Sequence, residues 1–347
     1  MKKYLLPNDV NWYRANMHCH TSISDGTLSP EQIKDAYKAE GYSIVAYTDH
    51  EILLDHSDLN DESFLALTSS EYSINTETPS FESLYQGSTD TWPRRKTIHL
   101  CIYSKNQHNE KQPAADDASL WAQGGKYRGQ GRCDGYKREL TKESVQETID
   151  RCNRAGFFVQ LNHPYWSLNE REDYIDLKGL WSLEILNYAT ERLTGAEYCP
   201  YIYDDMVRNG MFNLFCTMGD DNHNRGGSFE SSFGGSTFFG AKELKYESII
   251  SAMENGEFFC ASGKNPPLIK ALYVENNVLK VECTPAVDII LTGYCRKYRV
   301  KTGDGITSAE FPLDRDDVFF RITVRDKFGN NAHTHYYRVD DYYEEEK

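Results

Sequence analysis

The sequence predicts an α/β fold with a small β-rich C-terminal domain, and three observations lead to this prediction. Short β-branched apolar runs alternate with segments of helical spacing through residues 1–264. Glycines end several of the helical segments, as they do at helix C-termini. After residue 264 the pattern changes to short alternating runs with turn signals between them. We therefore expect an α/β domain over 1–264 and a β-rich domain over 265–347.

The first strand–helix–strand unit lies within the first 50 residues. Residues 16–20 are predicted to form the end of a strand. Ser29 is a helix N-cap and Gln32, three residues later, closes a capping box, so a helix begins there and ends at Gly41. The β-branched run 42–47 is a buried strand. Because a helix joins the two strands, they are expected to be parallel neighbours.

The same alternation returns after a polar insertion over about residues 75–140, which shows little periodicity. We expect this insertion to lie at the mouth of the sheet. The later α/β elements are predicted as helices over 142–155, 196–210 and 246–255 and strands over 157–162, 183–186 and 212–217. The C-terminal domain is predicted to contain strands over 269–274, 278–283, 287–291, 319–324 and 334–339.

Composition excludes several classes of partner. The chain has 38 Lys and Arg against 53 Asp and Glu, a formal net charge of −15, which disfavours long nucleic acids and anionic membranes. No apolar run approaches the roughly 18 residues of a membrane helix. No apolar leader follows the N-terminal lysines, and the nine cysteines form no CxxC pair, so we expect a cytoplasmic protein with reduced thiols. A homo-oligomer formed through a strand edge is one expectation for the C-terminal domain.

Histidines and acidic residues collect at the predicted strand ends. His18 and His20 have the i, i+2 spacing that places two side chains on one face of a strand. Six histidines and three acids share this placement, and burying so many ionisable groups without partners is costly. They are His18, His20, Asp25, His50, Glu71, His99, His163, Asp221 and His223.

This set of imidazoles and carboxylates suits catalytic divalent ions. Donor sets without thiolates favour Zn, Mn or Fe at an open site. Nine ligands exceed the needs of one ion, so we expect two or three divalent ions with a bridging carboxylate.

The same residues resemble a known family. The motifs 18–21, 24–26 and 46–50, with 162–164 and 219–223, resemble those of the PHP (polymerase and histidinol phosphatase) family of metal-dependent phosphoesterases. The resemblance spans residues 13–262, and a looser one links the lead-in and C-terminal segments to stand-alone hydrolases with an appended β domain. Asp220 departs from the family pattern, in which a small Ser or Thr is commoner at this position.

The resemblance implies a distorted (β/α)7 barrel with a trinuclear site. One ion would be held by His18, His20, Glu71 and Asp221. A second would share Glu71 and add His99 and His163, and a third would take Asp25, His50 and His223. A hydroxide bridging two ions would then attack phosphorus in line.

Other residues near these motifs are candidates for catalysis or substrate binding. Asp49 precedes a ligand and is expected either to orient the site or to accept a proton. Arg225 is expected to act on the substrate phosphate, with Arg94 and other basic residues of the insertion as further substrate-binding candidates. The aromatic residues 165, 166 and 188 are as consistent with packing as with stacking on a substrate.

The predicted function is hydrolysis of a small phosphomonoester, such as a nucleotide or a sugar or amino-alcohol phosphate. Three alternatives stay open. The first is a phosphodiesterase on short nucleotides and the second a carbamate, ester or amide hydrolase, and both would use the same ions. The third is a non-catalytic binding module, against which the complete ligand set counts.

Overall fold

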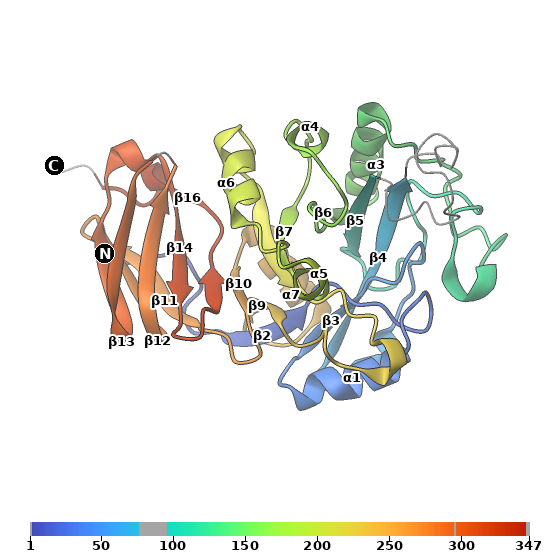
Figure 1. Ribbon diagram of the computed structural model, residues 1–347, viewed down its shortest axis with the longest axis horizontal. Coiled ribbons are helices and arrows are strands. Elements are labelled where there is room, and N and C mark those ends of the chain that lie inside the picture. Colours follow the sequence, from blue (N-terminus) through green and yellow to red (C-terminus); the bar gives the residue numbers. More distant parts are fainter. Residues whose placement is uncertain (1, 76–95, 295, 345–347) are drawn as a thin grey trace.

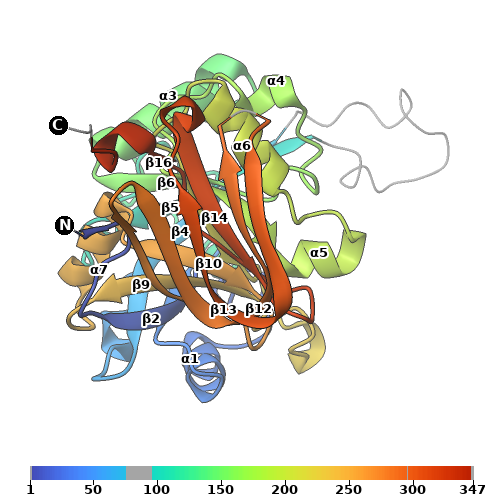
Figure 2. The same cartoon turned by 90° about the vertical axis from the view of Figure 1, so that its left-hand side faces the viewer.

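The computed structural model describes residues 2–75, 96–294 and 296–344. A mixed α/β part lies beside a stack of C-terminal strands (Figure 1), and Figure 2 shows those strands face on. The described residues contain six α-helices and one large mixed sheet. None of the helices in these ranges is long and apolar enough to span a membrane.

The first strand–helix–strand unit is confirmed. Strand β2 (Asn11–Asn16) and strand β3 (Ile44–Tyr47) are parallel, and helix α1 (Pro30–Ala39) connects them. The Ser29 capping box is present, with Gln32 donating its backbone N–H to the Ser29 hydroxyl. The predicted strand over 16–20 was wrong, because β2 ends at Asn16. The chain beyond it is extended and forms only an isolated bridge between Cys19 and Asn222.

Two long strands follow β3. Strand β4 (Leu65–Asn75) is parallel to β3, whereas strand β5 (Thr97–Ser104) is antiparallel to both of its neighbours. The insertion predicted over about residues 75–140 therefore includes the last residue of β4 and the whole of β5. Of its described remainder, the only helical segment is the 3₁₀ helix η3 (Ala122–Gly125), and the rest forms turns and short bridges.

The second half of the α/β part follows the predicted alternation. Helix α3 (Lys142–Arg154) leads into strand β6 (Phe157–Leu161), as expected. The helix predicted over 196–210 is shorter and is preceded by another helix, because Cys199–Pro200 starts a new segment. The remaining elements are α4 (Arg171–Tyr174), β7 (Ser182–Asn187), α5 (Tyr188–Thr194), α6 (Pro200–Arg208), β8 (Phe215–Gly219), β9 (Gly235–Ala241), α7 (Tyr246–Asn255) and β10 (Phe258–Ser262).

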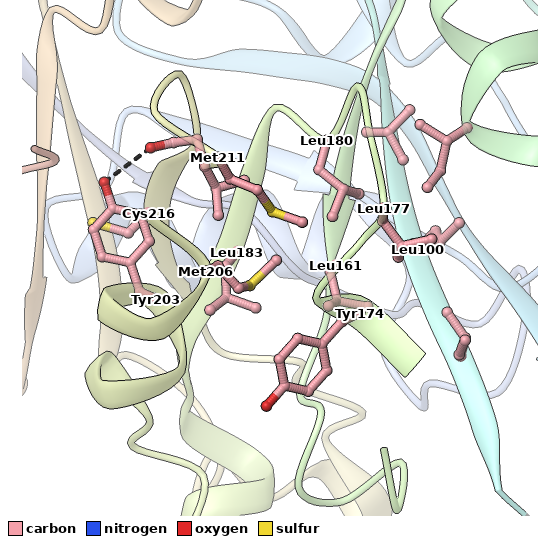
Figure 3. Packing of buried hydrophobic residues seen from close by; sticks show 14 of the residues in the cluster. Leu100, Leu161, Tyr174, Leu177, Leu180, Leu183, Tyr203, Met206, Met211 and Cys216 are labelled. Carbon is pink, nitrogen blue, oxygen red and sulfur yellow. Dashed lines mark hydrogen bonds between the residues drawn. The ribbon is translucent and has the colours of Figure 1, made fainter. Parts of the chain in front are cut away.

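The helices α3 and α6 cover one side of the strands β5 to β8. Apolar side chains from these strands, including Leu100, Leu161 and Leu183, lie in one buried cluster with Met206 and Tyr203 of α6 (Figure 3). Because this core fixes β5, β6 and β7 as neighbours, it also fixes the side chains at their ends.

The sheet is not closed, so the exact (β/α)7 barrel is not confirmed. Its strands run in the order β9-β2-β3-β4-β5-β6-β7-β8, and no backbone ladder joins β8 to β9 in the described residues. The Thr237 hydroxyl crosses this seam and donates to the Met218 carbonyl at 3.2 Å. The antiparallel β5 also interrupts the regular parallel order.

The C-terminal strands continue the same sheet. Strand β15 (Asn331–His333) pairs with β10 through Cys260 and His333, and the N-terminal strand β1 (Lys3–Tyr4) pairs with β11 (Ile269–Glu275). The runs predicted over 278–283 and 287–291 form one strand with a register shift, and the exposed strand β13 was missed. The elements are β11 (Ile269–Glu275), β12 (Val278–Gly293), β13 (Tyr298–Pro312), β14 (Phe319–Arg325), β15 (Asn331–His333) and β16 (Tyr337–Arg338).

Candidate metal centre

The residues that follow β2, β3, β6 and β8 converge at one end of the sheet. The extended chain after β2 hydrogen-bonds to the chain after β8: His20 N–H donates to the Asn222 carbonyl at 3.0 Å, and Asp221 N–H donates to the His18 carbonyl at 2.8 Å. This pairing brings His18 and His20 opposite Asp221 although neither histidine lies in a regular strand. Glu71 and His99 extend from β4 and β5 themselves.

The first cluster contains His18, His20, Glu71 and Asp221, all buried. Nε2 of His20 lies 2.9 Å from Asp221 Oδ1 and 3.4 Å from Glu71 Oε2. Nε2 of His18 lies 3.2 Å from Glu71 Oε1 and 3.2 Å from Nε2 of His20. Two ligand atoms of one tetrahedral ion are about 3.3 Å apart, since each lies about 2.0–2.1 Å from it. The cluster therefore has the spacing of a metal site.

The second cluster shares Glu71 with the first. Glu71 Oε1 lies 3.0 Å from Nδ1 of His99 and 3.1 Å from Nε2 of His163. All three residues are buried. Glu71 thus lies between the histidines of the first cluster and those of the second, which is the position of a bridging carboxylate.

The third cluster lies nearer to solvent. Asp25 Oδ2 is 3.1 Å from Nε2 of His223, and Oδ1 is 4.0 Å from Nε2 of His50. His20 belongs to this group too, with Nδ1 at 3.8 Å from Asp25 Oδ1. All nine residues predicted from the strand ends therefore lie in three adjoining groups.

Three buried polar atoms of these clusters, His20 Nδ1, His50 Nδ1 and Asp221 Oδ1, make no hydrogen bond of regular geometry in the described residues. Asp221 Oδ1 only faces Nε2 of His20, at 2.9 Å, and His50 Nδ1 only faces Glu71 Oε2, at 3.2 Å. Buried polar atoms are normally paired, and leaving them unpaired costs free energy. Divalent cations would satisfy these atoms, so the residues present fit such ions.

The electrostatics of the clusters are consistent with this fit. Burial alone would raise the pKa of Glu71, but the surrounding His99, His18 and His50 outweigh it and hold that pKa well below its usual range. The pKa of Asp221 is likewise lowered against the effect of burial, chiefly by His18 and His20. Both carboxylates are therefore ionised and available as ligands.

A further layer of polar side chains surrounds the clusters, and the sequence did not predict it. Glu184 of β7 is fully buried, and its Oε1 lies 3.0 Å from Nδ1 of His18. Asn162 donates to Glu71 Oε1 at 2.8 Å, and Asn187 donates to Asp221 Oδ2 at 3.1 Å. A charged residue inside the apolar run 183–186 was the signal available for Glu184, since Glu is rarely buried unpaired.

The two aspartates beside the clusters hold loops. Asp49 accepts hydrogen bonds from the backbone N–H and hydroxyl groups of both Thr21 and Ser24, at 2.7–3.1 Å. Asp220 accepts hydrogen bonds from the Tyr37 hydroxyl and from three backbone N–H groups at 233–235. Burial raises the pKa of Asp220 to about 6.

The basic side chains predicted to bind the substrate are not among the residues of the three clusters. Arg225 is exposed at the start of η4 (Arg225–Gly227), two residues after His223. Arg94 lies outside the described residues. Arg128, from the same insertion, donates to the backbone carbonyls of Leu120 and Ala118. These hydrogen bonds hold the insertion together, and neither of them joins Arg128 to a residue of the clusters.

Comparisons with known proteins give structural likenesses. No family model and no curated protein matches the chain. A two-domain protein from Bacteroides vulgatus that contains a predicted PHP-like metal-dependent phosphoesterase shares 14% identity, with a TM-score of 0.45 and 93% of each chain covered.

Two other solved structures are similar over a smaller part of the chain. A protein from Bifidobacterium adolescentis, assigned as a metal-dependent phosphoesterase, shares 16% identity, with a TM-score of 0.40; the match covers 61% of this chain and 88% of that one. An amidohydrolase from Chromobacterium violaceum, with bound sulfate and no metal, shares 13% identity, with a TM-score of 0.39 and coverages of 60% and 87%.

Proposed function

We propose that the protein is a metal-dependent hydrolase that releases phosphate from a small phosphomonoester. One observation carries the proposal: three donor clusters adjoin one another, and the buried Glu71 carboxylate links two of them. Clusters that share a carboxylate are the arrangement expected for two or three ions acting on one substrate. The ligands would be the nine residues named above. We keep the cytoplasmic location as part of this proposal.

Charge favours a phosphomonoester over a neutral substrate. When bound, divalent ions lower the pKa of water and offset negative charge on phosphate oxygens. The nine proposed ligands include three carboxylates, those of Asp25, Glu71 and Asp221, and the carboxylate of Glu184 lies beside His18. With three divalent ions and neutral imidazoles, the site would still carry a net positive charge. A dianionic phosphate group compensates this charge, whereas a carbamate or an ester does not.

Side chains around the clusters have supporting roles in the proposal. Glu184, Asn162 and Asn187 would keep the ligands in position, since each hydrogen-bonds to one of them. Asp49 would hold the loop that carries Asp25. Arg225 and Arg94 remain candidates for binding the substrate, because a guanidinium pairs well with phosphate oxygens.

Phosphate release tests the proposal directly. Protein reconstituted with manganese is incubated with a panel of phosphorylated metabolites, and inorganic phosphate is measured. We expect release from one or a few compounds. His18→Ala should abolish it, while His108→Ala, which changes an exposed histidine paired with Asp55, should not. Absence of release from every compound, with the ions shown to be bound, would overturn the proposal in favour of diester or carbamate substrates.

A further inference from the structure

A row of aromatic rings lies along the second and third clusters. Trp121, which directly precedes η3, lies with its ring centroid 5.3 Å from that of His50. His50 is 5.6 Å from His99, and His99 is 5.6 Å from Trp166. We call these four residues the aromatic rim. It joins a tryptophan of the insertion to a tryptophan that follows β6, through two candidate metal ligands.

Trp121 is held in place although it is half exposed. Its exposed fraction is 50%, and the preceding Leu120 is fully buried against Ile52. The backbone N–H of Gln123 donates to the Ile23 carbonyl at 2.8 Å, and Arg128 donates to the Leu120 carbonyl at 3.1 Å. A large apolar ring that is held with one face in water has a higher free energy than a covered ring. A ligand that covers this face would therefore gain binding free energy.

Trp166 is fixed from the other side. The buried carboxylate of Glu197 accepts hydrogen bonds from the backbone N–H groups of Tyr165 and Trp166, at 3.1 and 2.7 Å. The Trp166 ring also contacts His163 edge-on, at 5.1 Å. Both tryptophans are therefore positioned by the backbone beside candidate ligands of the second and third clusters.

We propose that the aromatic rim selects substrates in which a planar aromatic ring is attached to the phosphate group, with Trp121 as the main specificity-determining residue. The inference rests on the proposed function and narrows its substrate class. A phosphate group at the clusters would place the first atoms of its substituent next to the rim. Planar aromatic rings stack on tryptophan faces, whereas a small alkyl group offers little area for that contact.

Binding of two phosphonates, which a phosphatase does not hydrolyse, tests this inference. Manganese-loaded protein is titrated calorimetrically with phenylphosphonate and with methylphosphonate. We expect phenylphosphonate to bind roughly 10-fold more tightly, the size of one good stacking contact. Trp121→Ala should remove this preference without weakening methylphosphonate binding, and Trp121→Phe should retain part of it. Tyr298→Ala removes an exposed aromatic side chain of β13 and should change neither affinity.

Several outcomes would overturn the inference. Equal affinity of the wild type for the two phosphonates would do so, as would a preference that survives in Trp121→Ala. Loss of both affinities in that variant would indicate that Trp121 only shields His50. The proposed function fails separately: if no phosphomonoester is hydrolysed but the phenyl preference depends on Trp121, the rim stands and the phosphomonoesterase proposal falls.

Discussion

The carboxylate of Glu184 lies 3.0 Å from Nδ1 of His18, and both side chains are fully buried. A carboxylate in this position accepts a hydrogen bond from Nδ1–H and so directs the Nε2 lone pair toward the first cluster. Glu184 also accepts from the Asn187 side-chain amide at 3.0 Å and from the backbone N–H of His163 at 3.3 Å. One side chain of β7 therefore orients residues of the first two clusters.

Replacing this carboxylate should weaken metal binding. Glu184→Gln keeps the size of the side chain but removes its charge and one acceptor, so we expect a roughly 10- to 100-fold loss of affinity for manganese or zinc. Competition with a chelating dye measures it. Glu172→Gln, the same change on the exposed face of α4, should leave the affinity unchanged. Equal affinities for the folded Glu184→Gln protein and the wild type would contradict this positioning role.

Asp49→Ala should release the loop that carries Asp25. The change removes the acceptor of four hydrogen bonds from Thr21 and Ser24. We expect a destabilisation of about 1–3 kcal/mol and a lower metal content after dialysis, measured by elemental analysis. Asp55→Ala, which removes an acceptor for the Ser57 N–H in another turn, is the control for metal content. A loss of kcat with full metal content would instead support Asp49 as a proton acceptor.

The sequence predicted helices α1, α3 and α7, strands β3, β6 and β7 and all nine clustered residues, because each prediction depended on local signals, whereas strands β9 and β10 were missed. The capping box at Ser29 and the apolar run 44–47 are examples that the structure confirms. Strand β13 was missed because most of its residues are exposed and polar, so it lacks alternation. Whether the sheet closes depends on how β8 meets β9, which no single segment encodes.

The surrounding layer of the site could not be predicted for a related reason. Glu184 contacts His18 across 166 residues of sequence, and Trp121 contacts His50 from a segment without periodicity. Such contacts follow from strand order and from the path of the insertion. Strand ends are local features, and therefore the nine candidate ligands could be recognised in the sequence.

The contact between α6 and β14 provides a test of stability. Arg321 donates two hydrogen bonds to Asp204, at 2.7 and 2.9 Å, and both side chains are largely buried. Asp204→Ala leaves the guanidinium buried without its carboxylate, so unfolding by urea should show a loss of about 3–5 kcal/mol. Asp205→Ala breaks a more exposed pair with Arg171 and should have a small effect. Similar small losses in both variants would contradict this account.

His335 should make the folded protein sensitive to acid. Its ring packs against Phe215 and Tyr337, its Nδ1 has no partner in the described residues, and burial lowers its pKa from 6.5 to about 3. Between these values the unfolded chain binds a proton that the folded chain does not, so stability falls as pH decreases, by about 1.4 kcal/mol per unit for this residue. His335→Phe removes the titrating group from an aromatic site. The free energy of unfolding is measured with urea at pH 7.5 and at pH 5.0. Its decrease between these two pH values should be about 2 kcal/mol smaller in the variant than in the wild type. Equal losses for the two proteins would mean that His335 takes up its proton without unfolding.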